Sequence, residues 1–208
     1  MNARVGRCWS CGADPGGDFL CRQCGRIQPP DPSVDFFTLL NLPLSPHPAH
    51  TEMDNRYREI QQTIHPDRFT TASPLEQQFS MQQVVRLNEA YQTLGNALQC
   101  ANYLLSLLGG VEDFGERHHD AGFLMGVMEL RETLEEAETR QNVDELDALR
   151  REIDHRIRQE ETSCGQALQA LAGGNDLARQ EAATHLNRWR YYQRFQEEVE
   201  RVEERLLG

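Results

Sequence analysis

Residues 56–69 read RYREIQQTIHPDRF, and this stretch decides the fold of the chain around it. Apolar side chains repeat at the spacing of one α-helical face at Tyr57, Ile60 and Ile64, and the pattern begins at Met53, just before the stretch. Pro66 ends the helix, because proline lacks the N–H that would continue the backbone hydrogen bonds. The tripeptide His65-Pro66-Asp67 is therefore predicted to form a turn directly after a helix.

A second helix is predicted on the other side of this turn, from about Ser73 to Leu94. Its apolar face is expected to carry Phe79, Val84, Leu87, Tyr91 and Leu94. Two amphipathic helices joined by an exposed turn form an antiparallel hairpin, which places the tripeptide at the tip. A short amphipathic segment, residues 35–42, precedes the hairpin and ends at Pro43.

Helical patterns also fill the rest of the chain. One apolar helix is expected over residues 97–108, and three longer ones over about 119–140, 143–172 and 177–206. Short connections make the last three antiparallel neighbours, so they are predicted to form a three-helix bundle. Because no convincing strand pattern lies beyond residue 30, the fold class is predicted to be all-α. The expected domains are a metal-binding module, a hairpin domain and a bundle, over residues 1–30, 31–110 and 111–208.

Four cysteines near the start of the chain form two Cys-x-x-Cys pairs, Cys8 with Cys11 and Cys21 with Cys24. A pair of this spacing points two sulfurs at one tetrahedral ion, and a glycine after each pair permits the tight backbone that this requires. The predicted four-sulfur site is closed, and hence structural rather than catalytic. About thirty residues cannot fold on their own core, so the metal would stabilise the module almost alone.

The expected metal is one structural zinc ion, although an iron site like that of rubredoxins and a pair of disulfides remain alternatives. The chain shows no apolar run of the ~20 residues that a membrane span needs, and its first residues lack the apolar core of a signal peptide. A reducing compartment is therefore expected, which favours thiolates over disulfides. The bacterial cytoplasm and the mitochondrial matrix both satisfy this expectation.

The first bundle helix carries large apolar side chains on two opposite faces. With a rotation of about 100° per residue, a core stripe is formed by Phe123, Val127, Leu130, Leu134 and Ala137. Leu124, Met125 and Met128 lie roughly opposite, bordered by Glu129 and Glu132. Exposed Leu and Met side chains of this kind indicate a protein-binding patch. The alternative is that they pack against another helix of the same chain.

The hairpin resembles a J domain. The resemblance rests on Asp35-Phe36-Phe37 through Leu42-Pro43, on the helix around Arg56-Tyr57-Arg58, on His65-Pro66-Asp67-Arg68-Phe69, and on Leu87-Asn88-Glu89-Ala90-Tyr91. It implies docking onto a DnaK-class chaperone and stimulation of its ATP hydrolysis. In that family Asp67 is expected to meet an arginine of the chaperone, while His65 and Pro66 shape the turn. Arg56 and Arg58 would face an acidic patch on the chaperone, the alternative being an ordinary solvated helix face.

With the bundle included, residues 33–208 resemble the HscB-type (Jac-type) iron–sulfur co-chaperones. The added residues are Phe123-Leu124-Met125 through Glu129-Leu130-Arg131-Glu132, and Tyr191, which matches an aromatic position of the last helix. The resemblance implies that Leu124, Met125, Met128, Glu129, Glu132 and Tyr191 bind an IscU-type scaffold protein, which the chain delivers to a DnaK/HscA-class chaperone. Gly126, where a better helix former is expected, departs from the pattern and would weaken the helix by ~1 kcal/mol.

Charge and motif content exclude several other functions. The net charge is −12, and residues 111–208 carry thirteen basic against twenty-three acidic residues, so a nucleic-acid phosphate backbone would be repelled. No nucleophile–base constellation or phosphate loop indicates an enzyme. The alternative function is a J-domain co-chaperone for other clients, with the zinc module binding protein or nucleic acid. A homodimer remains open as a further partner.

Overall fold

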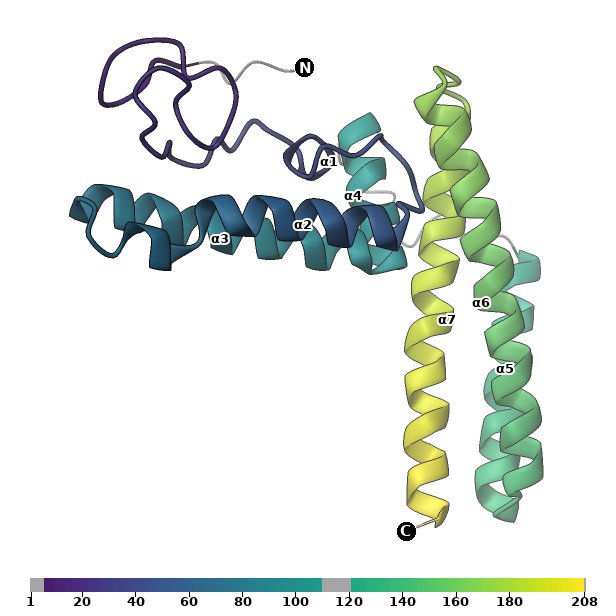
Figure 1. The fold of residues 1–208 in the computed structure, drawn as a ribbon. Coiled ribbons are helices and arrows are strands. Elements are labelled where there is room, and N and C mark those ends of the chain that lie inside the picture. Colours follow the sequence, from purple (N-terminus) through teal and green to yellow (C-terminus); the bar gives the residue numbers. More distant parts are fainter. Residues whose placement is uncertain (1–5, 110–120, 208) are drawn as a thin grey trace. The chain divides into compact units, whose positions relative to one another are not determined.

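Regular structure in the described residues, 6–109 and 121–207 of the computed structural model, consists of seven α-helices and one 3-10 turn (Figure 1). The only strand-like pairing among these residues is an isolated antiparallel bridge between Leu20 and Ile27. The prediction of an all-α fold is confirmed. The chain divides into two compact units, Met1–Cys100 and Ala101–Gly208, which are described separately below.

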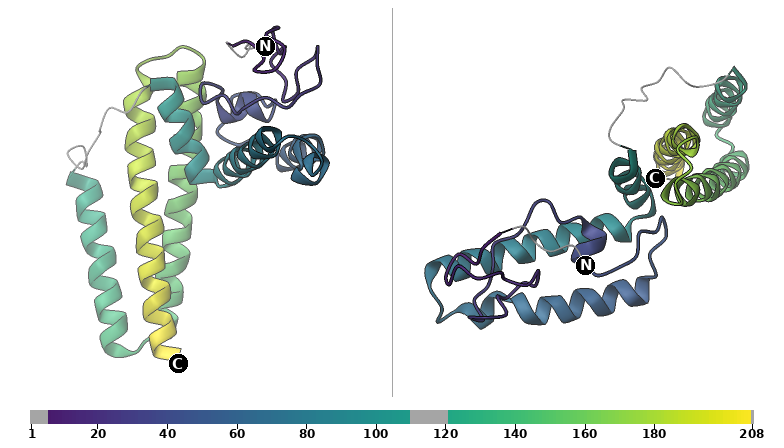
Figure 2. Two further views of the ribbon diagram at one scale, coloured as in Figure 1. Left: turned by 90° about the vertical axis from the view of Figure 1, so that its left-hand side faces the viewer. Right: turned by 90° about the horizontal axis from the view of Figure 1, so that it is seen from above.

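The first unit is built around the predicted helical hairpin. Its elements are α1 (Phe36–Leu39), α2 (His50–Ile64), the 3-10 turn η1 (Pro66–Phe69) and α3 (Pro74–Gly95). In Figure 2, α2 and α3 lie side by side and run in opposite directions. The core of this unit contains fully buried side chains from α1, α2 and α3 and from the residue after α1; among them are Phe37, Leu40, Met53, Ile64 and Leu87.

Two tyrosines join the helices of the hairpin through their hydroxyls. Tyr57 on α2 donates to Asn88 Oδ1 on α3 at 2.8 Å, and Tyr91 on α3 donates to Asp54 Oδ1 on α2 at 2.6 Å. The two rings also lie 4.6 Å apart between centroids. Both tyrosines are half-buried, and their hydroxyls link α2 to α3.

The buried face of α3 differs from the predicted one. Of the expected apolar residues only Leu87 and Leu94 are buried, whereas Phe79, Val84 and Tyr91 are half-buried. The buried row instead begins with three polar residues, Glu76, Ser80 and Gln83. The first half of α3 packs against polar groups of the N-terminal loop and the end of α2. The spacing of its apolar residues therefore does not identify the buried face in this half.

The second unit is a helical bundle formed by α5 (Ala121–Arg140), α6 (Val143–Ala172) and α7 (Ala178–Leu207). α6 and α7 are long antiparallel neighbours, and α5 lies alongside them (Figures 1 and 2). The predicted core stripe of α5 is confirmed: all five residues from Phe123 to Ala137 are buried in one cluster with α6 and α7. The expected start of α5 near residue 119 lies outside the described residues.

Local signals in the sequence place the bundle's turns. Asn142 caps α6 by accepting a hydrogen bond from the Glu145 N–H at 3.3 Å. Gly174, two residues after the end of α6, has φ +94°, a conformation that favours glycine. α4 (Ala97–Gly109) contributes Ala101 and Leu104, both buried, to this part of the chain. No helix among the described residues is both long and apolar enough to cross a bilayer.

Candidate functional site

The first candidate site is the group of four cysteines, which the fold brings together as the spacing predicts. Their sulfurs all lie within 4.8 Å of one another, with Cys8 and Cys24 at 3.7 Å and Cys11 and Cys21 at 3.8 Å. Thiolates bound to one tetrahedral zinc at ~2.3 Å are separated by ~3.8 Å, whereas a disulfide needs ~2.05 Å. The geometry fits a four-sulfur metal site, so this group could hold a metal ion.

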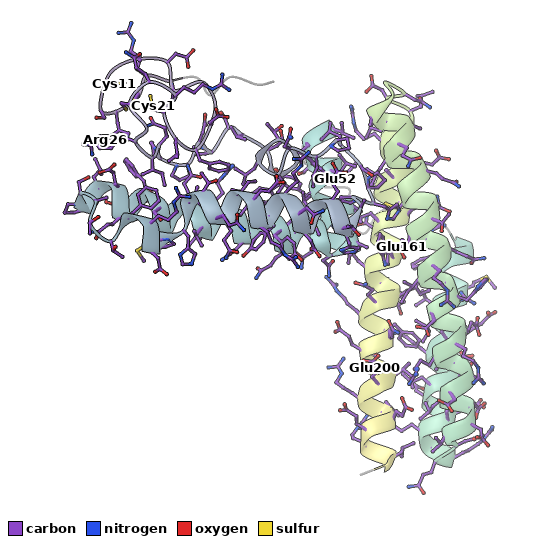
Figure 3. The ribbon with its side chains drawn as sticks, in the orientation of Figure 1. Cys11, Cys21, Arg26, Glu52, Glu161 and Glu200 are labelled. Carbon is purple, nitrogen blue, oxygen red and sulfur yellow. The ribbon has the colours of Figure 1, made fainter. Side chains whose placement is uncertain are left out.

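The same backbone turn presents each cysteine pair. Gly12 donates its N–H to the Cys8 carbonyl at 2.9 Å, and Gly25 donates to the Cys21 carbonyl at 2.8 Å. Both glycines have φ near +70°, where a side chain would be strained. The glycine after each pair is therefore required by the turn that aims the two sulfurs. Figure 3 shows Cys11 and Cys21 close together in these loops, with Arg26 nearby.

Electrostatics also favour a cation at this position. A backbone hydrogen bond from Cys11 lowers the pKa of the Cys8 thiol to about 6. The pKa of Cys24 is lowered by a backbone hydrogen bond from Arg26, but burial and the neighbouring thiols raise it more, to about 11. The Cys8 thiolate therefore forms readily, whereas the Cys24 thiolate is opposed by its neighbours, and a cation among the sulfurs would favour both.

Gln28 belongs to this site, although spacing arguments did not single it out. Its side-chain Nε2 donates to Cys8 Sγ at 3.4 Å and to the Arg26 carbonyl at 2.8 Å. The residue is only 4% exposed. Hydrogen bonds to a ligating sulfur orient the ligand and tune the metal that it binds. A single glutamine outside the Cys-x-x-Cys pattern carries no sequence signal for this contact.

The second candidate site is the turn at the tip of the hairpin. His65 caps η1, because its Nδ1 accepts a hydrogen bond from the Asp67 N–H at 3.3 Å. Arg68 donates from Nη1 to the Gln62 carbonyl at 2.8 Å and so ties the turn back to α2. The Asp67 side chain is 86% exposed. The predicted tripeptide therefore forms a fixed turn with its carboxylate directed to solvent.

Arg56 and Arg58 lie on α2, about two and a half and about two helical turns before His65. Arg56 is half-buried and pairs with Glu59 at 3.3 Å between Nη1 and Oε2. Arg58 is exposed. Both guanidinium groups belong to the same helix that ends at the exposed turn, so positive charge is available beside it.

The third candidate site is the outer face of α5, opposite its buried stripe. Leu124 is 48% exposed, Met125 63% and Met128 61%. Glu129 and Glu132 are also exposed and follow these residues along the helix. These five residues are called the α5 patch below. Within the described chain, the alternative that the three apolar side chains pack against another helix is wrong.

Tyr191 on α7 meets α5 at the side of this patch. Its hydroxyl accepts a hydrogen bond from Arg131 Nε at 3.1 Å, and its ring lies edge-on to Phe123 at 5.7 Å between centroids. Phe195 stacks on the ring from the other side. Tyr191 is half-buried among core residues. Its first contribution is therefore to the packing of α5 against α7.

Gly126 has a packing reason that its helix propensity did not indicate. A Cβ at this position would come within 3.2 Å of Arg156 Nη1 on α6. The Arg156 guanidinium also lies over the Tyr192 ring, 5.8 Å from its centroid. The glycine lets α5 and this cation–aromatic pair come close together.

Comparisons with known proteins identify the family of the chain. A family model described as the HSCB C-terminal oligomerisation domain matches residues 119–200. The iron–sulfur cluster co-chaperone protein HscB of Mus musculus is 35% identical over 157 residues, which cover 71% of this chain and 67% of the mouse protein. The co-chaperone protein HscB homolog of Colwellia psychrerythraea is 34% identical over 177 residues, or 84% of this chain and 99% of the relative.

Solved structures agree with the sequence relatives. The crystal structure of human co-chaperone protein HscB matches with a TM-score of 0.81 at 28% identity, covering 93% of this chain and 96% of the human one. The chaperone HscB from Vibrio cholerae matches with a TM-score of 0.66 at 32% identity, covering 83% and 99%. The predicted family and its non-catalytic character are confirmed. The chain belongs to the HscB family of iron–sulfur cluster co-chaperones.

Proposed function

We propose that the chain is a two-ended adaptor in iron–sulfur cluster biogenesis. One end is a J domain, residues 31–110, which docks on a DnaK/HscA-class chaperone and stimulates its ATPase. The other end is the bundle, residues 111–208, which carries an IscU-type scaffold. Holding both proteins on one chain raises their effective local concentration, so the scaffold reaches the chaperone as it is activated.

The exposed α5 patch is the observation that carries this proposal. Three large apolar side chains, each about half exposed or more, occupy a helix whose opposite face is completely buried. Leaving Leu124, Met125 and Met128 in water has no structural benefit for the bundle, whereas an apolar surface rimmed by Glu129 and Glu132 suits a protein partner. Methionine adapts its shape to a partner surface at low cost.

Tyr191 supports the patch by fixing α5 against α7. The scaffold would touch its hydroxyl edge, where Arg131 already donates a hydrogen bond. Because the ring packs edge-on against Phe123 and stacks on Phe195, it would add a rigid aromatic edge to the binding surface. Rigid anchors of this kind lose little entropy on binding.

The chaperone end uses the exposed turn and the basic face of α2. Asp67 would accept a hydrogen bond from an arginine of the chaperone, and its 86% exposure leaves it accessible for that contact. His65 and Pro66 would keep the turn in shape, and the hydrogen bond from Asp67 N–H to His65 Nδ1 supports this role for His65. Arg56 and Arg58 would steer the hairpin to an acidic surface.

The four cysteines would hold one structural zinc ion in the module formed by residues 1–30. Tetrahedral spacing and thiol-only ligands suit zinc and also iron, so the metal's identity needs a direct measurement. Zinc would supply no redox chemistry here and would serve to fold the loops. A homodimer is a further expected state, and the description of the matching family model as an oligomerisation domain supports that expectation.

Affinity capture on an immobilised IscU-type scaffold tests the proposal. The wild-type chain and a His65→Gln variant should both be retained, because the substitution lies on the chaperone end. A chain with Leu124, Met125 and Met128 all changed to alanine should be lost from the resin. Equal retention of that triple variant would refute the scaffold assignment.

A further inference from the structure

The first half of α3 buries a row of polar side chains, which is unusual for a helix face. Glu76, Ser80 and Gln83 are spaced by four and three residues, and are 7%, 0% and 1% exposed. Burying polar groups costs free energy unless hydrogen bonds replace those with water. The hydrogen-bond partners of these three side chains therefore identify the segments that this face of α3 supports.

Gln83 connects α3 to the cysteine site. Its Nε2 donates to the backbone carbonyl of Gln28 at 2.9 Å. The Gln28 side chain in turn donates to Cys8 Sγ at 3.4 Å. Both glutamines are buried, so these hydrogen bonds are shielded from competing water. Two residues are enough to link a metal-ligating sulfur to the hairpin.

Ser80 connects the same row of α3 to the exposed turn. Its hydroxyl donates to the Ile64 carbonyl at 2.6 Å, and both residues are fully buried. Ile64 is the last residue of α2 and directly precedes His65. Since Ser80 and Gln83 are one helical turn apart, one short stretch of α3 holds the cysteine loops on one side and the base of the turn on the other.

Further contacts fasten the cysteine loops to the beginning of α3. Arg26 Nη1 pairs with Glu76 Oε2 at 2.6 Å, and the same oxygen accepts a hydrogen bond from the Ser73 hydroxyl at 2.7 Å, beside the capping box that these two residues form. The Trp9 ring lies edge-on to Phe79, 5.8 Å between centroids. Ile27 is fully buried. The loops thus form part of the core at the tip of the hairpin.

We propose that metal binding by the four cysteines braces the His65-Pro66-Asp67 turn through Gln28, Gln83 and Ser80. The proposal rests on the proposed metal binding and is independent of the scaffold assignment. Without the metal, only these contacts with the hairpin would keep the cysteine loops folded, because segments of about thirty residues depend on such a staple. Gln83 then loses its contact with Gln28 and Glu76 its contact with Arg26, and the first turns of α3 hold the base of the turn less firmly. Loss of metal would weaken the chaperone end without any change to the turn itself.

Hydrogen exchange of the full chain, read by mass spectrometry, tests the brace. Protein saturated with zinc is compared with protein treated with a chelator, and metal content is measured in both. Peptides covering residues 62–76 should exchange about fivefold faster or more after chelation, as expected when local opening becomes easier. Peptides from α6 should not change. Unchanged exchange over residues 62–76, while the cysteine loops lose protection, would overturn the proposal.

A matched pair of variants tests the contact from Gln83 to Gln28 separately from metal binding. Gln83→Leu removes the donor to Gln28, and Gln82→Leu places the same change at an exposed neighbour on α3. With zinc bound, Gln83→Leu should already show the faster exchange over residues 62–76, and Gln82→Leu should match wild type. Equal effects of both variants on exchange would show that Gln83 does not connect the cysteine loops to the turn. A wild-type chain that binds no zinc would refute the assignment of zinc to the four cysteines. The two variants would still test whether the contact between Gln83 and Gln28 supports the turn.

Discussion

Arg26 and Glu76, fifty residues apart, form a salt bridge of 2.6 Å that joins the cysteine loops to the start of α3. The carboxylate is nearly buried, whereas the Arg26 side chain is 45% exposed. Glu76 also completes the capping box of α3 with Ser73. This single contact couples the fold of the N-terminal loops to the helix that supports the hairpin turn.

Replacing Arg26 by glutamine should lower the free energy of unfolding of the first unit by about 1 kcal/mol, since the exposed guanidinium is partly screened. Arg22→Gln is the control, because Arg22 pairs with Asp18 on the surface of the same loops. That control should change stability by less than about 0.5 kcal/mol. Urea unfolding followed by Trp9 fluorescence, in a Trp189→Phe background, measures both. Equal effects of the two substitutions would contradict the role of Arg26.

Metal removal should change the reactivity of four cysteines and leave two unchanged. In the zinc-loaded chain no cysteine should react with a thiol reagent at pH 8, and after chelation Cys8, Cys11, Cys21 and Cys24 should react. Burial raises the pKa of Cys100 to about 11 and that of Cys164 to about 12, so both should stay unreactive until the chain unfolds. Mass spectrometry of the labelled peptides distinguishes the two groups. Labelling of Cys164 in the folded chain would show that the bundle opens there.

The buried Cys164 thiol also predicts how the bundle responds to alkaline pH. Burial raises its pKa in the folded chain from 9.0 to about 12, so the folded state binds the proton more tightly than the unfolded state. The contribution of the protonated thiol to the free energy of unfolding is complete below pH 9 and is lost as the pH rises from 9 towards 12. Wild type should therefore lose stability faster than Cys164→Ala over this range. Parallel pH profiles of thermal unfolding would contradict the raised pKa.

Single alanine substitutions in the α5 patch should separate binding from folding. Met128→Ala should leave the stability of the bundle within about 0.5 kcal/mol of wild type, because the side chain is 61% exposed. Its affinity for an IscU-type scaffold should fall by about tenfold or more, as for a contact worth above 1 kcal/mol. Leu130→Ala is the contrast, since burial predicts a loss of about 2–5 kcal/mol in stability. Calorimetric titration and thermal unfolding measure the two quantities.

Much of the fold could be predicted from the sequence where apolar periodicity reflects the packing. On α5 the five residues of the predicted core stripe are all buried, and Leu124, Met125 and Met128 on the opposite face are exposed. The prediction failed on α3, because periodicity counts apolar residues and the buried row there is polar. Glu76 and Gln83 are hydrogen-bonded to partners fifty or more positions away, which no local pattern reveals.

The candidate sites divide in the same way. The four cysteines follow from spacing, because the chemistry of a tetrahedral ion fixes both the residue type and the interval. The contribution of Gln28 could not be predicted from spacing, since its hydrogen bond to Cys8 exists only in the folded loops. The roles of His65, Pro66, Asp67 and Tyr191 rest on resemblance to a family, as no periodicity or spacing distinguishes them from ordinary turn and core residues.

The ATPase rate of a DnaK/HscA-class chaperone, measured with the chain in the presence and absence of an IscU-type scaffold, tests the adaptor most directly. Wild type should stimulate the rate, and the scaffold should increase that stimulation further. His65→Gln should abolish both effects, whereas the triple alanine variant of Leu124, Met125 and Met128 should keep the first and lose the second. Undiminished stimulation by His65→Gln would contradict the account.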